Sequence, residues 1–354
     1  MWLPVILLRE FGWAGWAVFA APNVVGAAAM GLVLRRPGAS QAFLRGRMGA
    51  ARWFSRVTIA FQIFFCVWVW TVAFGRSQTL PAACFAAGVM FLAAAFAGLR
   101  RWDALSVGVW IASGGLMLAA FLRGADHLAP PPPTGDAQAL DAIYLAASCV
   151  FGFTMCPFLD LTFHRVRQHT PGASGNAAFI LGFGVLFLAM ITGTLVYASA
   201  LLRNRWLPPL ILAHMALQAA FTAGAHAREL AEVGPRRLEG ALCMAVGLAL
   251  GVGFAWLERG RMPVIAEDGY TIFMAFYGVI FPAWVWIVAR PIGPGARAQR
   301  RVWLAAVVLA APAFALGFLG KQWWWLAPGV GIVLIARPLA ASAASRRPPQ
   351  SAPN

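Results

Sequence analysis

Charged side chains are scarce in this sequence. Asp, Glu, Lys and Arg make up 11% of the 354 residues, whereas hydrophobic residues make up 61%. About a quarter of the residues in soluble domains are charged, so this composition excludes a soluble globular domain. Long stretches hold no charge at all. They have the length of about 20 apolar residues that a helix needs to cross a bilayer core about 30 Å thick.

Eleven stretches lack any charged residue, and each predicts one transmembrane helix. We therefore expect an all-α, multi-pass transmembrane bundle of about eleven helices. The stretches are 11–34, 57–75, 77–99, 104–122, 142–159, 168–202, 206–227, 240–257, 269–289, 302–320 and 322–336.

Lysine is nearly absent, since Lys321 is the only lysine among 28 basic residues. The arginines lie mainly between the apolar stretches. If the N-terminus faces outward, the inward connections and tail hold 20 of the basic residues and the outward ones hold 8. Cytoplasmic loops are enriched in Lys and Arg, so we expect the N-terminus outside and the C-terminus inside. The lack of lysine beside abundant alanine suggests a GC-rich genome, so the expected location is a bacterial inner membrane.

Several chemical motifs are missing as well. The net charge of +16 would suggest a nucleic-acid partner for a soluble protein, but no basic stretch carries a reader motif. The cysteines lie in apolar stretches without ligand spacing, as small buried hydrophobic residues do. They are Cys66, Cys84, Cys149, Cys156 and Cys243. Without a His-Glu-x-x-His motif or a phosphate loop, we expect no metal, no catalytic residue and no cofactor except a coupling Na⁺ or H⁺. The expected partners are the bilayer and a small solute, and no partner subunit can be named.

The longest outward connection, 123–139, contains four consecutive prolines, which are typical of extended polyproline II. It separates a four-helix segment, 1–122, from a seven-helix segment, 140–337. The final residues, 338–354, are rich in Ala, Ser, Arg and Pro, and they predict a disordered cytosolic tail. Because the other connections are short, we expect consecutive helices to pack as antiparallel neighbours.

Two stretches combine a proline with polar side chains. Pro22 precedes Asn23, and Pro157 lies between Thr154 and Asp160. A proline removes a backbone hydrogen bond and frees a carbonyl oxygen, and unwound backbone at membrane depth lines protein or a cavity. We therefore predict that Thr154, Asp160 and Asn23 bind an ion or a solute. A packing kink, or an interfacial ion pair of Asp160, is the alternative.

The seventh stretch carries His214, Gln218 and Thr222 four residues apart, which places them on one helix face. His214 and Gln218 are candidates to line a solute path. Hydrogen bonding between helices, which membrane bundles use routinely, explains the same pattern and is the interpretation we favour.

The fifth stretch resembles the sixth core helix of the amino acid–polyamine–organocation transporter superfamily. The order of features is the same: Phe151-Gly152-Phe153, then Pro157, then Asp160, then the basic end Arg165-Val166-Arg167. The first stretch, from Glu10 to Arg36, looks like the second core helix of sodium:solute symporters. This resemblance implies coupled transport of a small solute near Thr154 and Asp160. Core helix one has no counterpart in this sequence. We therefore expect either that the chain is a shortened relative or that its start codon is placed too late.

Two other classes of function stay open. Gly172-Ala173-Ser174-Gly175 resembles the serine motif of rhomboid intramembrane proteases, which pair that serine with a histidine. His214 and His226 are the histidines available to it, and the charge count places Ser174 on the inner side. An accessory membrane subunit without its own activity is the third class.

Overall fold

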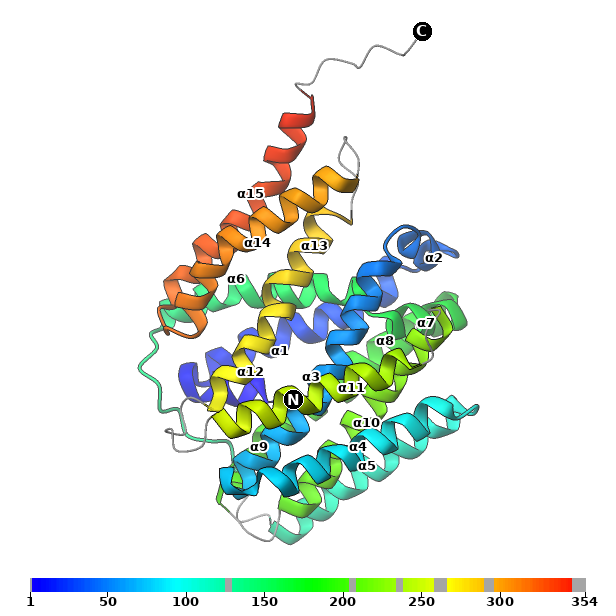
Figure 1. Ribbon diagram of the computed structural model, residues 1–354, viewed down its shortest axis with the longest axis vertical. Coiled ribbons are helices and arrows are strands. Elements are labelled where there is room, and N and C mark those ends of the chain that lie inside the picture. The colour runs from blue at the N-terminus through cyan, green and yellow to red at the C-terminus, as the bar shows by residue number, and fades with distance from the viewer. Residues whose placement is uncertain are drawn as a thin grey trace.

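The chain forms a bundle of helices in a computed structural model, and the described part contains no strand (Figure 1). The described residues are 2–124, 129–203, 208–233, 238–257, 266–289 and 296–345. Within them, 10 helices are long and apolar enough to cross a membrane, and Trp323–Leu339 is a shorter apolar helix. The prediction of an all-α multi-pass bundle with about eleven helices is confirmed.

The helices that cross the bundle follow the predicted order. They are α1 (Leu3–Val33), α3 (Met48–Phe74), α4 (Thr79–Gly98), α5 (Trp102–Gly124), α6 (Ala139–Met155), α8 (Gly172–Phe179) continued by α9 (Leu188–Arg203), α10 (Pro208–Val233), α11 (Glu239–Leu257), α12 (Ala266–Ala275) continued by α13 (Phe281–Ile287), α14 (Ala296–Phe318) and α15 (Leu326–Ser345). Two short helices, α2 (Ala39–Leu44) and α7 (Leu161–His169), connect crossing helices at one end of the bundle.

Several helices extend beyond the charge-free stretches. α3 begins at Met48, so Arg52 and Arg56 lie on a helix instead of in or beside a loop. α15 continues to Ser345. Residues 338–345, which were predicted to begin a disordered tail, are therefore helical. The remainder of that predicted tail, 346–354, lies outside the described residues. Residues 129–138 have no regular secondary structure, in keeping with the prediction of an extended connection.

The expectation that consecutive helices pack together holds for only some pairs. α3 packs against α4, and α14 packs against α15. The most extensive other contacts join helices far apart in sequence, such as α3 with α11, α1 with α6, and α10 with α3, α4 and α5. α4 and α5 hardly touch, because α10 packs against both of them. The segments 1–122 and 140–337 therefore share one core.

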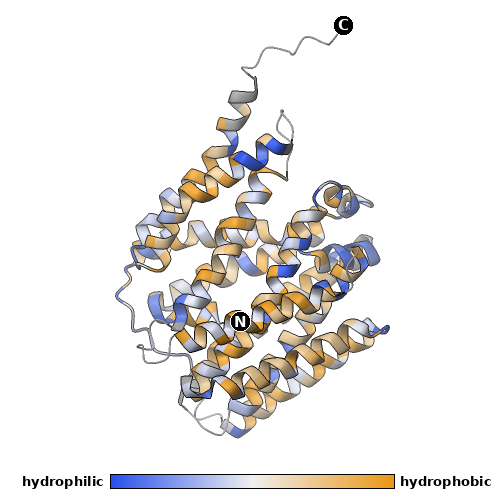
Figure 2. Cartoon of the chain, viewed as in Figure 1, coloured by the Kyte–Doolittle hydropathy of each residue, from blue (hydrophilic) through white to orange (hydrophobic). Residues whose placement is uncertain are grey.

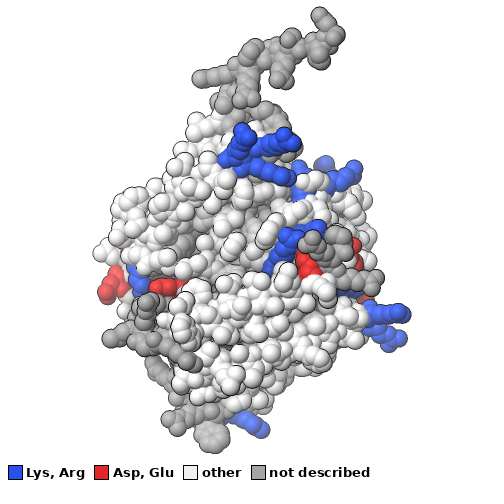
Figure 3. Space-filling view, in the orientation of Figure 1, with Lys and Arg blue, Asp and Glu red and all other residues white. Residues whose placement is uncertain are grey.

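The two ends of the bundle carry different charges. Hydropathic colouring is orange along the helices and blue near α2, α7 and the start of α14 (Figure 2). The same regions carry clusters of Lys and Arg in the space-filling view (Figure 3). We call this the arginine-rich end and the opposite one the acidic end. With the positive-inside rule, the arginine-rich end is the one expected in the cytosol.

The helix breaks lie only partly where proline predicted them. α1 runs through Pro22 without interruption, and its non-helical residue is Gly12. Pro157 does break its helix, because Cys156–Leu159 is a 3₁₀ turn and Asp160 is extended. Two further segments, Ile180–Phe187 and Phe276–Ile280, are π-helical. A single π-turn is often found at functional sites.

Candidate functional site

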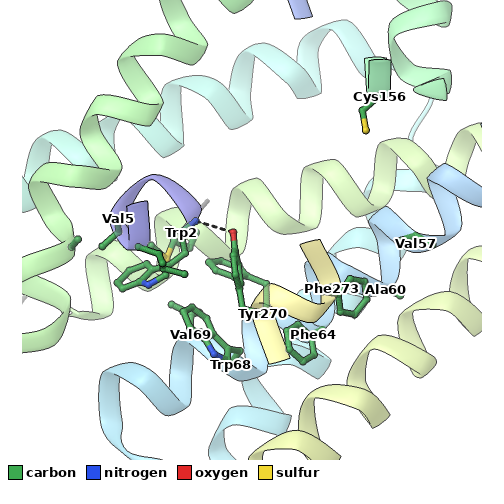
Figure 4. Packing of buried hydrophobic residues seen from close by; sticks show 14 of the residues in the cluster. Trp2, Val5, Val57, Ala60, Phe64, Trp68, Val69, Cys156, Tyr270 and Phe273 are labelled. Carbon is green, nitrogen blue, oxygen red and sulfur yellow. Dashed lines mark hydrogen bonds between the residues drawn. The ribbon is translucent and has the colours of Figure 1, made fainter. Parts of the chain in front are cut away.

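The beginning of the chain folds into the acidic end of the bundle. Gly12 has φ 61° and ψ −155°, a conformation that is essentially restricted to glycine. The kink turns the segment 3–11 back, so that a side chain at Gly15 would meet the Leu7 carbonyl oxygen at 2.3 Å. Trp2 is 1% exposed, and its backbone N–H donates to the Tyr270 hydroxyl at 3.4 Å (Figure 4). The segment is thus part of the core.

The proline-containing connection holds this kink in place. The backbone N–H groups of Thr134 and Gly135 donate to the carbonyl oxygen of Arg9 at 2.9 and 3.0 Å. A side chain at Gly135 would lie 2.5 Å from the Glu10 carbonyl oxygen, so only glycine fits there. The connection therefore supplies the hydrogen bonds that the break at Gly12 takes away from the Arg9 carbonyl.

A cavity of about 1410 Å³ lies behind this kinked segment. Its walls come from the segment before Gly12, the proline-containing connection, α6, α12 with the π-helical Phe276–Ile280, and α14. It extends from charged side chains at the acidic end to Ser148 and Gly278, about half-way along the spans Ala139–Leu159 and Glu267–Ile287. The cavity is larger than the roughly 300–1,000 Å³ of most ligand pockets.

The mouth of the cavity is acidic although the chain as a whole is basic. Two basic and five acidic side chains line it: Arg9, Lys321, Glu10, Asp136, Asp141, Glu267 and Asp268. Arg9 pairs with Glu267, and Lys321 donates to Glu10 at 2.7 Å. Asp141 accepts from the Gln138 backbone N–H at 2.8 Å. Within the described ranges no ion pair joins Asp136 or Asp268, so the mouth keeps an excess of negative charge.

Small and polar groups form the floor of the cavity. Ser148 is 2% exposed and lines the cavity. Within the described residues its hydroxyl has no hydrogen-bond partner, which leaves it available to a bound molecule. Gly278 lies opposite, and a side chain added there would be 4.0 Å from the Ser148 hydroxyl. The Ser148 hydroxyl is therefore a hydrogen-bonding group that the floor presents to the cavity.

Close backbone contacts join α1, α6 and the π-helical Phe276–Ile280 at the inner part of the cavity. A side chain at Gly26 would lie 2.3 Å from the Phe153 carbonyl oxygen, and one at Gly152 would lie 2.9 Å from the Tyr277 carbonyl oxygen. The Cys156 thiol donates to that same Tyr277 carbonyl at 3.1 Å. The aromatic-Gly-aromatic motif around Gly152 thus marks the crossing of α6 with α1 and with the π-helical segment.

Ion pairs hold helices together at the arginine-rich end. Arg52 and Arg56 each bind the Glu239 carboxylate at 2.5 Å, which ties α3 to α11. Arg165 of α7 binds Glu229 of α10 at 2.5 Å and also pairs with Glu232. Glu239 and Glu229 are buried, with side-chain exposures of 7% and 8%.

Arginines also bind backbone carbonyls at this end. Arg47 donates to the Ala289 carbonyl at 2.7 Å, and Arg167 donates to the carbonyls of Leu34 and Arg35 at 3.0 Å. These contacts connect the ends of α1, α3, α7 and α13. The cavity does not extend to any of these arginines.

The predicted binding residues of α1 and α6 do not line the cavity. Asp160 caps the N-terminus of α7, accepting from the Thr162 backbone N–H at 2.8 Å and from its hydroxyl at 2.6 Å. The Thr154 hydroxyl donates to the Val150 carbonyl at 2.6 Å, within its own helix. Asn23 is half-buried in α1. Among the described residues, no hydrogen bond or ion pair joins these three side chains to one another, and their predicted role stays a hypothesis.

His214 and Gln218 are brought together, but on the other side of the bundle. The His214 Nδ1 lies 2.7 Å from the Ser113 hydroxyl, and the Gln218 amide donates to the same hydroxyl at 2.8 Å. Ser113 belongs to α5, so the group joins α10 to α5. The favoured interpretation, hydrogen bonding between helices, describes this geometry.

Two more buried histidines bind serines at the arginine-rich end. The His226 Nδ1 lies 3.0 Å from the Ser55 hydroxyl. His164 lies 2.9 Å from the Ser40 hydroxyl through Nδ1 and 3.0 Å from the Phe158 carbonyl through Nε2. The carbonyl can only accept, so Nε2 of His164 carries a proton. Burial lowers the pKa of His164, and the nearby Asp160 carboxylate opposes that shift.

Ser174, the serine of the rhomboid-like motif, is exposed at the start of α8. The two histidines considered for it bind Ser113 and Ser55 instead. No group of three His, Cys, Asp or Glu side chains in the described ranges is arranged to hold a metal ion.

Sequence reasoning missed the cavity residues. Asp141, Glu267 and Asp268 lie in the first turns of α6 and α12, where acidic residues offset the helix dipole and look ordinary. One signal was available, since five of the 12 acidic residues gather at the predicted outward connections and now line a single mouth. Ser148 gave no signal among the many small residues of its stretch.

No family model, no curated protein and no solved structure matches this chain.

Proposed function

We propose that this multi-pass membrane protein is a secondary transporter that receives a small solute in the cavity at its acidic end. One observation carries the proposal: the cavity begins at charged side chains of the acidic end and reaches the middle of the spans at Ser148 and Gly278, and it does not extend to the arginines of the other end. Binding at the midplane with access from one side at a time is the arrangement of alternating access.

The irregular helices beside the cavity support this proposal. The kink at Gly12 and the π-helical Phe276–Ile280 both contribute to its walls. Irregular backbone at membrane depth is tolerated only where it is buried in protein or lines a cavity. Single π-helical turns inside α-helices are also frequent at functional sites.

The charge of the mouth favours a cation as the coupling ion. Asp136 and Asp268 have no ion-pair partner in the described ranges, and a cleft lined by one sign of charge concentrates counter-ions. Na⁺ or H⁺ is the coupling ion we propose.

Thr154 and Asp160 take a different place in this proposal from the one predicted. Phe153 lines the cavity, and Thr154 follows it toward the arginine-rich end. A solute that leaves the cavity in that direction passes Thr154 first and Asp160 next. These residues are candidates for the exit path.

The test begins with binding. A library of small solutes is screened for those that raise the thermal stability of the purified protein in Na⁺ and in choline buffers. Gly278→Leu fills the floor of the cavity, whereas Gly114→Leu serves as the matched control, since a side chain at Gly114 meets nothing within 4 Å and lies outside the cavity.

A solute that stabilises the native chain and Gly114→Leu, but not Gly278→Leu, is then tested for uptake into proteoliposomes. We expect uptake that depends on a Na⁺ or H⁺ gradient and is lost in Gly278→Leu. Equal stabilisation of both variants, or binding without gradient-driven uptake, contradicts the proposal.

A further inference from the structure

A second hollow lies on the opposite side of the bundle from the cavity walls, along α5. It has a volume of about 600 Å³ and is bounded by the connection between α4 and α5, by one face of α5 and by Leu217 of α10. It exists because α10 packs against both α4 and α5 and keeps these consecutive helices apart. We call it the α5 groove.

The α5 groove is apolar along its length and positively charged at one end. Ala104, Gly108 and Ala112 recur every four residues, so they line one face of α5 over about 12 Å. Arg100 and Arg101 lie at the arginine-rich end of the groove, and both are exposed. The small side chains leave room for a narrow apolar molecule.

Arg100 and Arg101 differ in their binding partners from the arginines that tie helices together. Arg52, Arg56 and Arg165 bind carboxylates, whereas within the described residues no ion pair or hydrogen bond engages the guanidinium of Arg100 or Arg101. Asp103 is also exposed in the first turn of α5. The net charge of Arg100, Arg101 and Asp103 together is therefore +1.

We propose that the α5 groove binds one anionic phospholipid, with its phosphate between Arg100 and Arg101 and an acyl chain along Ala104, Gly108 and Ala112. The groove lies on the surface that the membrane covers, and arginine pairs with phosphate through charge-assisted hydrogen bonds. Arginines next to a membrane span are a known attraction for anionic lipids. The groove adds a place for the acyl chain beside Arg100 and Arg101.

This proposal does not depend on transport, and it is tested by lipid binding to the purified full-length chain. The chain is incubated with equal amounts of palmitoyl-oleoyl phosphatidylglycerol and palmitoyl-oleoyl phosphatidylcholine, and the retained lipid is counted by native mass spectrometry. We expect one retained phosphatidylglycerol with a preference of roughly 30-fold over phosphatidylcholine, from two arginines beside one anionic headgroup.

The charge variant is Arg100→Gln with Arg101→Gln. Both side chains are exposed, so the fold should persist, and the preference should fall to near one. The matched control replaces the exposed Arg297, Arg300 and Arg301 of α14 by Gln and should keep most of the preference, because these arginines do not line the α5 groove.

The groove variant is Gly108→Phe, since a side chain at Gly108 meets nothing within 4 Å. It should release the retained lipid while both arginines remain. Gly115→Phe is equally open and lies on α5 outside the groove, so it should retain the lipid. Equal retention of the two lipids by the native chain, or full retention by Gly108→Phe, overturns the proposal.

Discussion

The two ends of this bundle are built by opposite means. At the arginine-rich end, buried carboxylates from α10 and α11 hold arginines from α3 and α7. At the acidic end, a backward-folded segment, a proline-containing connection and partly unpaired carboxylates surround a cavity of about 1410 Å³. The cavity is therefore open toward the acidic end and closed toward the arginine-rich end.

This difference follows from how charge and glycine are distributed. A buried carboxylate that binds two guanidinium groups holds helices together, and it cannot be separated from them without leaving an unpaired charge. At the acidic end, Gly12 with its positive φ allows the helix to turn back, and the ion pairs of that segment are only partly buried. The arginine-rich end therefore depends on buried carboxylates, and the acidic end depends on backbone geometry together with more exposed ion pairs. The following predictions test that contrast.

The largest effect is expected for Glu239→Ala. It leaves Arg52 and Arg56 without their shared carboxylate at the closed end. Removing one partner of a buried pair costs about 3–5 kcal/mol, and partial exposure of the arginines reduces this to about 2–3 kcal/mol. Thermal unfolding in detergent should show the loss. Asp136→Asn at the open end is the control and should change stability by at most about 0.5 kcal/mol. An equal change in unfolding temperature for the two variants would contradict the proposed difference between the two ends.

Gly12→Ala should act on the open end. The residue has φ 61° and ψ −155°, so an added Cβ is strained and should cost about 1–2 kcal/mol. The expected result is lower thermal stability together with a changed solute affinity. Gly38→Ala serves as the comparison, because Gly38 also has positive φ (77°) but lies at the arginine-rich end. A loss of solute affinity in Gly38→Ala, and not in Gly12→Ala, would contradict the role of the kink.

A pH effect is expected at the closed end. Burial lowers the pKa of His164, so between its folded and unfolded pKa values the unfolded chain binds more protons. Its contribution to stability is present above the ordinary histidine pKa of about 6.5 and is lost as the pH falls below it. The unfolding temperature should therefore drop between pH 7.5 and pH 5.5. His164→Gln should weaken this dependence, and an unchanged slope would show that another group causes it.

The smallest structural effect is expected for Asp160→Asn. Asparagine caps helices about as well as aspartate, so stability should change by less than about 0.5 kcal/mol. The variant therefore isolates the charge. Reduced gradient-driven uptake would place Asp160 on the solute path, and unaltered uptake would remove it from that path.

The sequence predicts the bundle well because the charge-free stretches have the length of a bilayer. It predicts the break at Pro157, but the same argument from the proline ring fails at Pro22, through which α1 runs without interruption. It does not predict the kink at Gly12, because glycine occurs throughout the chain and only the packing of Gly135 against Glu10 selects that one.

The cavity could not be predicted for a similar reason. Its residues come from the segment before Gly12, α6, α12 and α14, and no periodicity within one helix reports which distant helices meet. His214 and Gln218 show the converse case. Their spacing predicts a shared face correctly, while the partner Ser113 on α5 is visible only in the fold.

The most direct test of the account measures access to the cavity floor from each side. In a variant whose five native cysteines are replaced, Gly278→Cys is exposed to a membrane-impermeant thiol reagent. Gly114→Cys is the control, since it is exposed near the middle of α5, where lipid covers it. We predict that Gly278→Cys reacts from the acidic side and not from the arginine-rich side, while Gly114→Cys reacts from neither. Labelling of Gly278→Cys only from the arginine-rich side, or no more than that of Gly114→Cys, would contradict an open acidic end.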